Sequence, residues 1–228
     1  MDRTTHPGKF LSRLQWLQLT AAMLLLFCIS GCALGVMAGK MLMGDPKQTA
    51  VFHAATGTDL TKSQERVLII CSAPHGILNR FPSLEIDLVD RISRILETRG
   101  VQVVSSDQVA AWYDDHGEWG DFSELADSFD AHYVMNIELR TFSYQVPESD
   151  HLMQGSANGL VVFHEVTGEE LRPSYEVLRQ NFQLRFPETY PVPRENRSEQ
   201  IFAEGFMDRT AIHLAQMLYD HKSSETVH

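Results

Sequence analysis

A cysteine and a histidine lie four residues apart near the first strongly apolar run of the chain. Cys71 ends the run Val67–Cys71, and His75 follows within the break Ala73–Gly76. A cysteine beside a histidine can act as a thiolate nucleophile. Alternatively, the thiol is buried and packs as a small hydrophobic group, while the histidine occupies a surface loop. We favour this alternative. A serine nucleophile is not indicated either, because Ser72 lacks the flanking glycines of a Gly-x-Ser-x-Gly elbow. No catalytic residue is therefore predicted.

An acidic loop between two tryptophans is a second place where residue types could do chemistry. Its candidate ligands for a hard cation are Asp114, Asp115, His116, Glu118 and Asp121. The loop lacks the spacing of a calcium-binding loop, so no metal is predicted. The aromatic residues of the same region instead suggest a patch for a protein partner, made of Trp112, Tyr113 and Trp119. No glycine-rich phosphate loop is present, and no cofactor is predicted.

The N-terminal segment has the composition of an export signal. The run Leu14–Gly39 carries no charged residue, and three basic residues precede it. Its most apolar part, Ala21–Ile29, is followed by small residues, as in a signal peptide.

The tetrad Ile29-Ser30-Gly31-Cys32 resembles the bacterial lipobox, an aliphatic residue and two small residues before an obligatory cysteine. This resemblance implies cleavage before Cys32, a thioether-linked diacylglycerol on its sulfur, and N-acylation. Several acyl chains would hold the protein stably in membrane lipid. Ala33 takes the place of the aspartate that retains lipoproteins at the inner membrane of enteric bacteria, which favours the outer membrane.

An uncleaved transmembrane signal-anchor, extending to residue 39, is the competing interpretation. The charge-free run of 26 residues is long enough to span a bilayer. Gly31, Gly35 and Gly39 have the four-residue spacing that lets two membrane helices pack closely as a dimer. Either interpretation places the chain after Lys40 on the non-cytoplasmic side, because the positive flank stays inside.

The charge balance excludes some classes of partner. Removing residues 1–31 from the 228-residue chain leaves 197 residues with 16 basic and 29 acidic side chains, a net charge of −13. Such a charge argues against nucleic acid and against anionic lipid surfaces as direct partners. Cys71 is the one cysteine beyond Cys32, so no intrachain disulfide framework is expected.

The order of the predicted elements indicates an α/β fold. Residues 32–65 are expected to form a flexible tether, residues 66–222 a single domain, and residues 223–228 a disordered tail. Strands are predicted at 66–72, 101–105 and 133–139, with helices at 83–98, 106–112 and 121–131 between them. This β-α-β-α-β half has a mostly parallel sheet. A polar loop at 147–154, strands at 160–166 and 175–186 with a turn at 166–169, and an amphipathic helix at 198–221 follow. The elements would form a two-layer or three-layer sandwich.

Several stretches resemble known lipoproteins. The lipobox, the β-α-β-α-β unit, the strand Tyr133–Leu139 and the hairpin from Leu160 resemble an α/β domain of envelope lipoproteins. That group includes the N-terminal domain of the Tol-system propeller protein, the curli-secretion lipoprotein and the penicillin-binding-protein activator lipoprotein. The stretches Gly44–Pro46, Phe81–Asp90 and Phe142–Tyr144 resemble a lipoprotein family of planctomycete-type bacteria. Both resemblances imply an envelope location.

Two functions are consistent with these observations. The first is a non-enzymatic lipoprotein whose domain binds or positions a protein partner in envelope assembly. The second is a small envelope hydrolase that uses the loops Ser72–Gly76 and Tyr113–Gly120, because α/β sheets place ligands at the carboxyl ends of their strands. We favour the first function because no nucleophile, base and orienting group are recognisable together.

Overall fold

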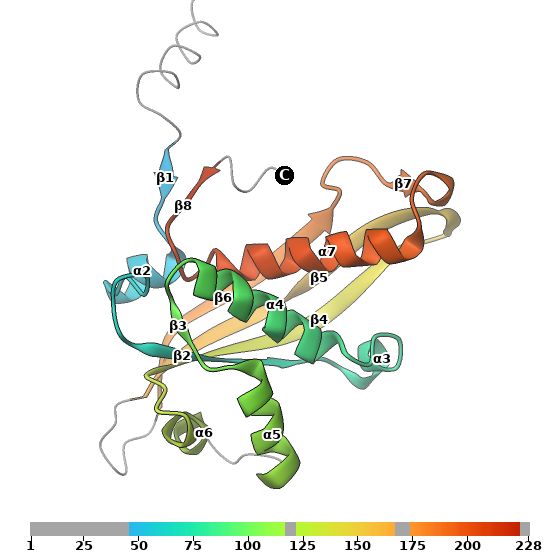
Figure 1. Ribbon diagram of the computed structural model, residues 1–228. Helices are drawn as coiled ribbons and strands as arrows, with labels where there is room; N and C mark the ends of the chain where they lie inside the picture. The colour runs from blue at the N-terminus through green and yellow to red at the C-terminus, as the bar shows by residue number, and fades with distance from the viewer. Residues whose placement is uncertain (1–45, 117–121, 167–173, 224–228) are drawn as a thin grey trace, which may run out of the picture. The chain divides into compact units, whose positions relative to one another are not determined.

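The computed structural model describes residues 46–116, 122–166 and 174–223. One compact unit, Lys47–His221, contains the features discussed below. In chain order the elements are β1 (Lys47–Gln48), α2 (Val51–Thr56), β2 (Arg66–Ser72), α3 (His75–Leu78), α4 (Leu84–Thr98), β3 (Gln102–Val103), α5 (Ser106–His116), α6 (Phe122–Ser128), β4 (Tyr133–Val146), β5 (Ser149–Glu165), β6 (Tyr175–Phe186), β7 (Val192–Pro193), the 3-10 turn η1 (Arg194–Asn196), α7 (Glu199–Ala215) and β8 (His221–Lys222) (Figure 1).

A six-stranded mixed sheet forms the centre of this unit. Its order is β3-β2-β4-β5-β6, and β7 pairs with β5 at one end. The strand β2 is parallel to both β3 and β4, whereas β4, β5 and β6 are antiparallel to one another. The short strands β1 and β8 pair separately. The predicted α/β class, a parallel half followed by an antiparallel extension and a final helix, is confirmed.

Helices cover both faces of the sheet where its strands are parallel. Val67 and Ile69 point into the main core beneath α4 and α7, whereas Leu68 and Ile70 point into a second core with α5 and α6. Figure 1 shows these two pairs of helices on opposite sides of β2. The sequence of β2 is apolar at every position from 67 to 70 because both of its faces are buried. This end of the fold has three layers.

The helix α4 has the apolar stripe that its sequence predicts. Buried residues recur along it at the spacing of helical turns, namely Leu84, Leu88, Ile92 and Leu96. Gly100, with φ +84°, follows its C-terminal end. Ser83 precedes the helix as expected, but its hydroxyl donates to the Asp87 carboxylate at 2.7 Å instead of accepting a backbone N–H.

The last helix is shorter than predicted and lies close to the sheet. α7 ends at Ala215, and the hydroxyl of Ser198 caps its beginning by accepting the Ile201 N–H at 3.2 Å. Its Phe206 is fully buried and lies over Gly155 of β5. A Cβ atom at Gly155 would lie 2.3 Å from Cδ2 of Phe206, so this strand position requires a glycine.

The long hairpin of β4 and β5 replaces the predicted loop at 147–154. β4 continues to Val146 and β5 begins at Ser149, so Pro147 and Glu148 alone make the turn. The polar residues of this region misled the prediction, since exposed strand positions such as Asp150 carry them. The second turn was predicted at 166–169, and residues 167–173 lie outside the described residues.

The predicted tether at 32–65 is wrong from Lys47 onwards. Phe52 of α2 has no exposed surface, and its ring lies 5.0 Å from that of Tyr133 and 5.3 Å from that of Phe163. Leu60 in the following loop is also fully buried. One buried aromatic residue in a six-residue helix produces no periodicity, which explains the error. Residues 32–45 and the tail at 224–228 lie outside the described residues.

Candidate functional site

An apolar cavity lies at the carboxyl end of β2, between α4 and α5. Its volume is about 370 Å³. We call it the β2 groove and define it by its lining residues: Ile69, Ile70, Cys71 and Ser72 of β2, Glu85, Ile86 and Val89 of α4, and Ser106, Val109 and Ala110 of α5. Apolar pockets with a few polar groups are the usual sites of ligand and partner binding.

The groove exists because β3 is short. β3 pairs only with Arg66 and Val67, and its chain then turns into α5. The C=O of Val67 accepts the Val104 N–H at 3.0 Å on this side of β2. Because strand residues alternate in the direction of their backbone groups, Ile69 and Cys71 present their N–H and C=O groups to the same side. Within the described part of the chain, no backbone or side-chain group hydrogen-bonds to them there.

The single thiol in the groove is not activated. Burial raises the pKa of Cys71, and the nearby carboxylate of Glu85 raises it further. A nucleophilic cysteine requires the opposite shift. The Glu85 carboxylate accepts the Ala73 N–H at 2.6 Å, and His75 lies exposed in the short helix α3. The arrangement therefore gives no support to Cys71 and His75 as a catalytic pair.

Exposed Ile86 is the feature of this site that the sequence could have shown. It is apolar but falls outside the stripe that α4 buries, and 62% of its surface is exposed. It lies at the rim of the groove, whose walls Val89 and Val109 are buried. Sequence reasoning did place the loop Ser72–Gly76 at a strand end suited to binding, and Ser72 lines the groove.

The structure describes the predicted aromatic patch only in part. Trp112 is half-buried and packs against the second core. The Tyr113 side chain and Trp119 lie outside what is described, as do residues 117–120 of the predicted loop Tyr113–Gly120, whose first half instead continues α5 to His116. Among the described residues, no cluster of histidine, cysteine and acidic side chains could hold a metal ion.

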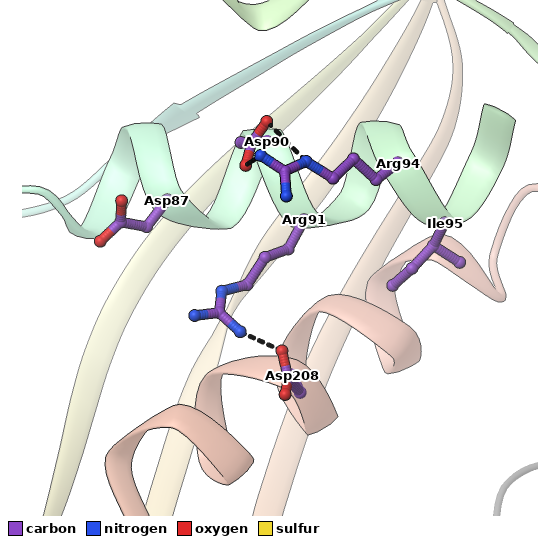
Figure 2. Close-up of a pocket in the computed structure, with 6 residues that line it drawn as sticks. All are labelled: Asp87, Asp90, Arg91, Arg94, Ile95 and Asp208. Atoms are coloured by element: carbon purple, nitrogen blue, oxygen red, sulfur yellow. Dashed lines mark hydrogen bonds and ion pairs between the residues drawn. The ribbon is translucent and has the colours of Figure 1, made fainter. Parts of the chain in front are cut away.

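A second cavity, of about 380 Å³, lies between α4 and α7 and is lined mostly by charged residues. Figure 2 shows how these residues pair with one another. Arg94 lies 2.7 Å from Asp90 across one helical turn, and Arg91 of α4 pairs with Asp208 of α7. Because these charges neutralise each other at a solvent-exposed surface, the cavity offers little to select a ligand. We do not assign it as the functional site.

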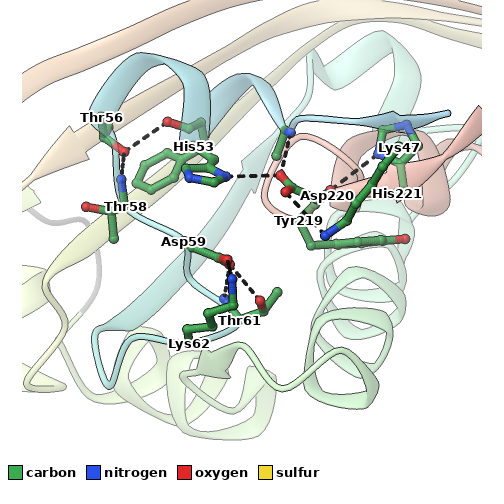
Figure 3. A network of polar contacts seen from close by, with 12 residues as sticks. Lys47, His53, Thr56, Thr58, Asp59, Thr61, Lys62, Tyr219, Asp220 and His221 are labelled. Atoms are coloured by element: carbon green, nitrogen blue, oxygen red, sulfur yellow. Dashed lines mark hydrogen bonds and ion pairs between the residues drawn. The ribbon is translucent and has the colours of Figure 1, made fainter.

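A polar network fastens α2 to the end of the chain (Figure 3). The Asp220 carboxylate accepts the Ala50 N–H at 2.9 Å and lies 3.1 Å from Nδ1 of His53. The Ala50 hydrogen bond is the main reason why the pKa of Asp220 is lowered. In the next loop, hydrogen bonds from Lys62 and Thr61 lower the pKa of Asp59 to about 2. Each carboxylate is satisfied within the fold, so this network is structural.

Comparison with known proteins gives a limited result. No protein-family model matches the sequence, and no curated protein sequence matches it. Among solved structures, the fold is similar to the lipoprotein GNA1162 from Neisseria meningitidis, with 11% identity, a TM-score of 0.41, and coverage of 65% of this chain and 96% of that one. It is also similar to the PelC dodecamer from Paraburkholderia phytofirmans, with 10% identity, a TM-score of 0.42, and coverage of 76% and 96%. Similarities this low say nothing about the partners of this chain.

The predicted membrane anchor lies outside the described residues. This applies to Cys32 and to the glycines at 31, 35 and 39. None of the helices within residues 46–116, 122–166 and 174–223 has the length and apolar character that a membrane crossing requires.

Proposed function

We propose that this protein is an envelope lipoprotein, anchored through Cys32, whose α/β domain binds a protein partner at the β2 groove. The observation that carries the proposal is the exposed Ile86 at the rim of an apolar cavity. Burying such a side chain against a partner removes apolar surface from water and contributes about 25 cal/mol per Å². A partner anchored at this point would be positioned at the membrane for envelope assembly.

The chemistry of the groove favours binding over reaction. Acyl transfer and related reactions require a nucleophile, a base and an orienting group that converge. The groove offers a thiol of raised pKa and a carboxylate already engaged by Ala73. Its remaining polar lining residues are Ser72 and Ser106. These groups suit recognition, and the apolar walls supply the contact area.

Photo-crosslinking in living cells tests the partner function. A p-benzoylphenylalanine residue is introduced at Ile86 or, as a control, at Ile201 of α7, which has a similar exposure of 59% but lies outside the groove. We expect one discrete protein adduct from position 86 and none of that mass from position 201. The adduct should disappear when Ala110→Trp fills the groove, and persist with Ala111→Trp on the exposed side of α5. If the adduct from position 86 persisted in the Ala110→Trp variant, the proposal would be contradicted.

Intact mass of the membrane-extracted protein tests the anchor. A lipoprotein would give the mass of a chain that begins at Cys32, increased by its acyl chains, and Cys32→Ala would abolish this species. A full-length, unmodified chain in both samples would disprove lipidation and would favour the signal-anchor with its glycine face. The crosslinking result is independent of this outcome, because either anchor leaves the domain on the same side.

A further inference from the structure

Building on the proposed function, we infer that the partner contributes a short extended segment, which adds to the sheet as a strand along the open edge of β2. The segment would have apolar side chains on both of its faces and a lysine or arginine near Glu85. It would lie in the line of β3, beyond the point where β3 ends. This inference names the kind of partner that the β2 groove takes.

The first argument is the unpaired backbone of β2. Ile69 and Cys71 each direct an N–H and a C=O into the groove, two residues apart, and neither has a backbone partner on that side among the described residues. Leaving such groups without hydrogen bonds in a largely apolar setting costs about 1–3 kcal/mol each. An extended peptide supplies donors and acceptors at the same two-residue spacing, which is how strand addition works.

The second argument is the position of the apolar walls. A strand added beside β2 would point alternate side chains to opposite faces of the sheet. On one face they would meet Ile86 and Val89 of α4, and on the other face Val109 and Ala110 of α5. Because both walls are apolar, the segment would have a nearly continuous apolar sequence, as buried strands of parallel sheets do.

The third argument concerns charge and length. Glu85 is the charged residue of the groove lining, and no basic residue lines it. A positive side chain on the segment would complement this carboxylate.

The Ser106 hydroxyl and the Asp90 carboxylate, 3.5 Å apart, connect α5 to α4 at the β3 side of the groove. The open edge therefore covers residues 69–72 of β2, which at about 3.3 Å per residue leaves room for roughly four residues of partner.

Backbone methylation of a bound peptide tests the inference. Phage-displayed linear heptapeptides are selected on the full-length protein in detergent, and the best binder is then synthesised with an N-methyl group at each backbone amide in turn. We expect methylation to alternate in effect: every second position loses about tenfold or more in affinity, because one hydrogen bond toward β2 is removed and the methyl group prevents close approach. The intervening positions should change little. Ala110→Trp should abolish binding, and Ala111→Trp should leave it intact.

The outcomes separate this inference from the proposed function. A peptide whose binding needs the groove but shows no alternation on methylation would overturn strand addition. A groove that binds dodecanoate, in a manner blocked by Ala110→Trp, while no peptide is selected would identify an acyl chain as the occupant and would also overturn it. In the first case a crosslink from position 86 to a protein would still support the proposed function, whereas in the second case the proposed function would fail as well. The methylation series changes only the peptide, so its alternation reports strand addition even if Ala110→Trp disturbs folding. A crosslink from position 86 to the peptide then places the added strand at the β2 groove and not at β6, the other edge of the sheet.

Discussion

Gly155 sets the distance between β5 and α7. We expect Gly155→Ala to lower the free energy of unfolding by about 1–3 kcal/mol, because the added methyl group would force the ring of Phe206 out of a fully packed position. Urea unfolding followed by circular dichroism measures this loss. Gly76→Ala is the matched control, since nothing lies within 4 Å of a Cβ atom at that position. Equal stability of Gly155→Ala and the wild type would contradict this close packing.

Single residues also show why the site was only partly predictable. Residue types identified Cys71 and His75 as candidates, but the pKa of a thiol depends on its burial and on neighbours such as Glu85. Ile86 could have been noticed, because it breaks the polar side of α4. The position of Ala110 in the wall of the groove could not have been predicted, because nothing in the sequence shows that this alanine borders a cavity.

At the scale of elements, long periodic segments were predicted well and short ones poorly. β2 and α4 agree closely with prediction because each buries a regular pattern of apolar residues. The strand predicted at 101–105 is the informative failure. Ser105 directly precedes α5, and its C=O accepts the N–H groups of Gln108 and Val109 in the first turn, so β3 stops at Val103. In the observed register a strand of the predicted length would have reached Ile69 and covered part of the open edge of β2, so the groove would be smaller.

The attachment of α2 should depend on pH through Asp220. Folding lowers the pKa of the Asp220 carboxyl below its ordinary value of 3.8. The ionised carboxylate therefore contributes its full stabilisation at pH values above the pKa of the unfolded chain, and this contribution is lost as the pH falls through the lower pKa of the folded state. Asp220→Ala leaves the buried Ala50 N–H without its acceptor, and we expect a loss of about 1–3 kcal/mol at pH 7. The difference from the wild type should shrink below pH 4.

Urea unfolding at pH 7, 4 and 3 measures this dependence. The exposed Asp150→Ala variant serves as a control, and we expect it to change stability by less than about 0.5 kcal/mol. A difference for Asp220→Ala that stays constant over this range would show that the charge of Asp220 does not fasten α2.

At the scale of the whole molecule, the folded unit begins earlier than the sequence suggested. Phe52→Ala should cost about 3–5 kcal/mol of unfolding free energy, because a fully buried aromatic ring is removed from the core. Val51→Ala, at a position that is 39% exposed, should cost far less. Thermal unfolding of the two variants compares them directly. Similar melting temperatures of the two variants would indicate that residues 47–65 form a tether and are not part of the folded unit.

The way α2 is fastened has a mechanical consequence. If the protein is held by its N-terminal anchor, tension between membrane and partner enters the fold at β1, which pairs with β8. This pairing and the ion pair between Lys47 and Asp220, at 3.5 Å, resist it first. The Ala50 hydrogen bond to Asp220 and the bond from the Phe52 N–H to the Met217 C=O, at 3.0 Å, come next. None of these residues lines the β2 groove. Force from the anchor would thus pass first into the end of the chain after α7, and the partner could stay bound while the membrane attachment is strained.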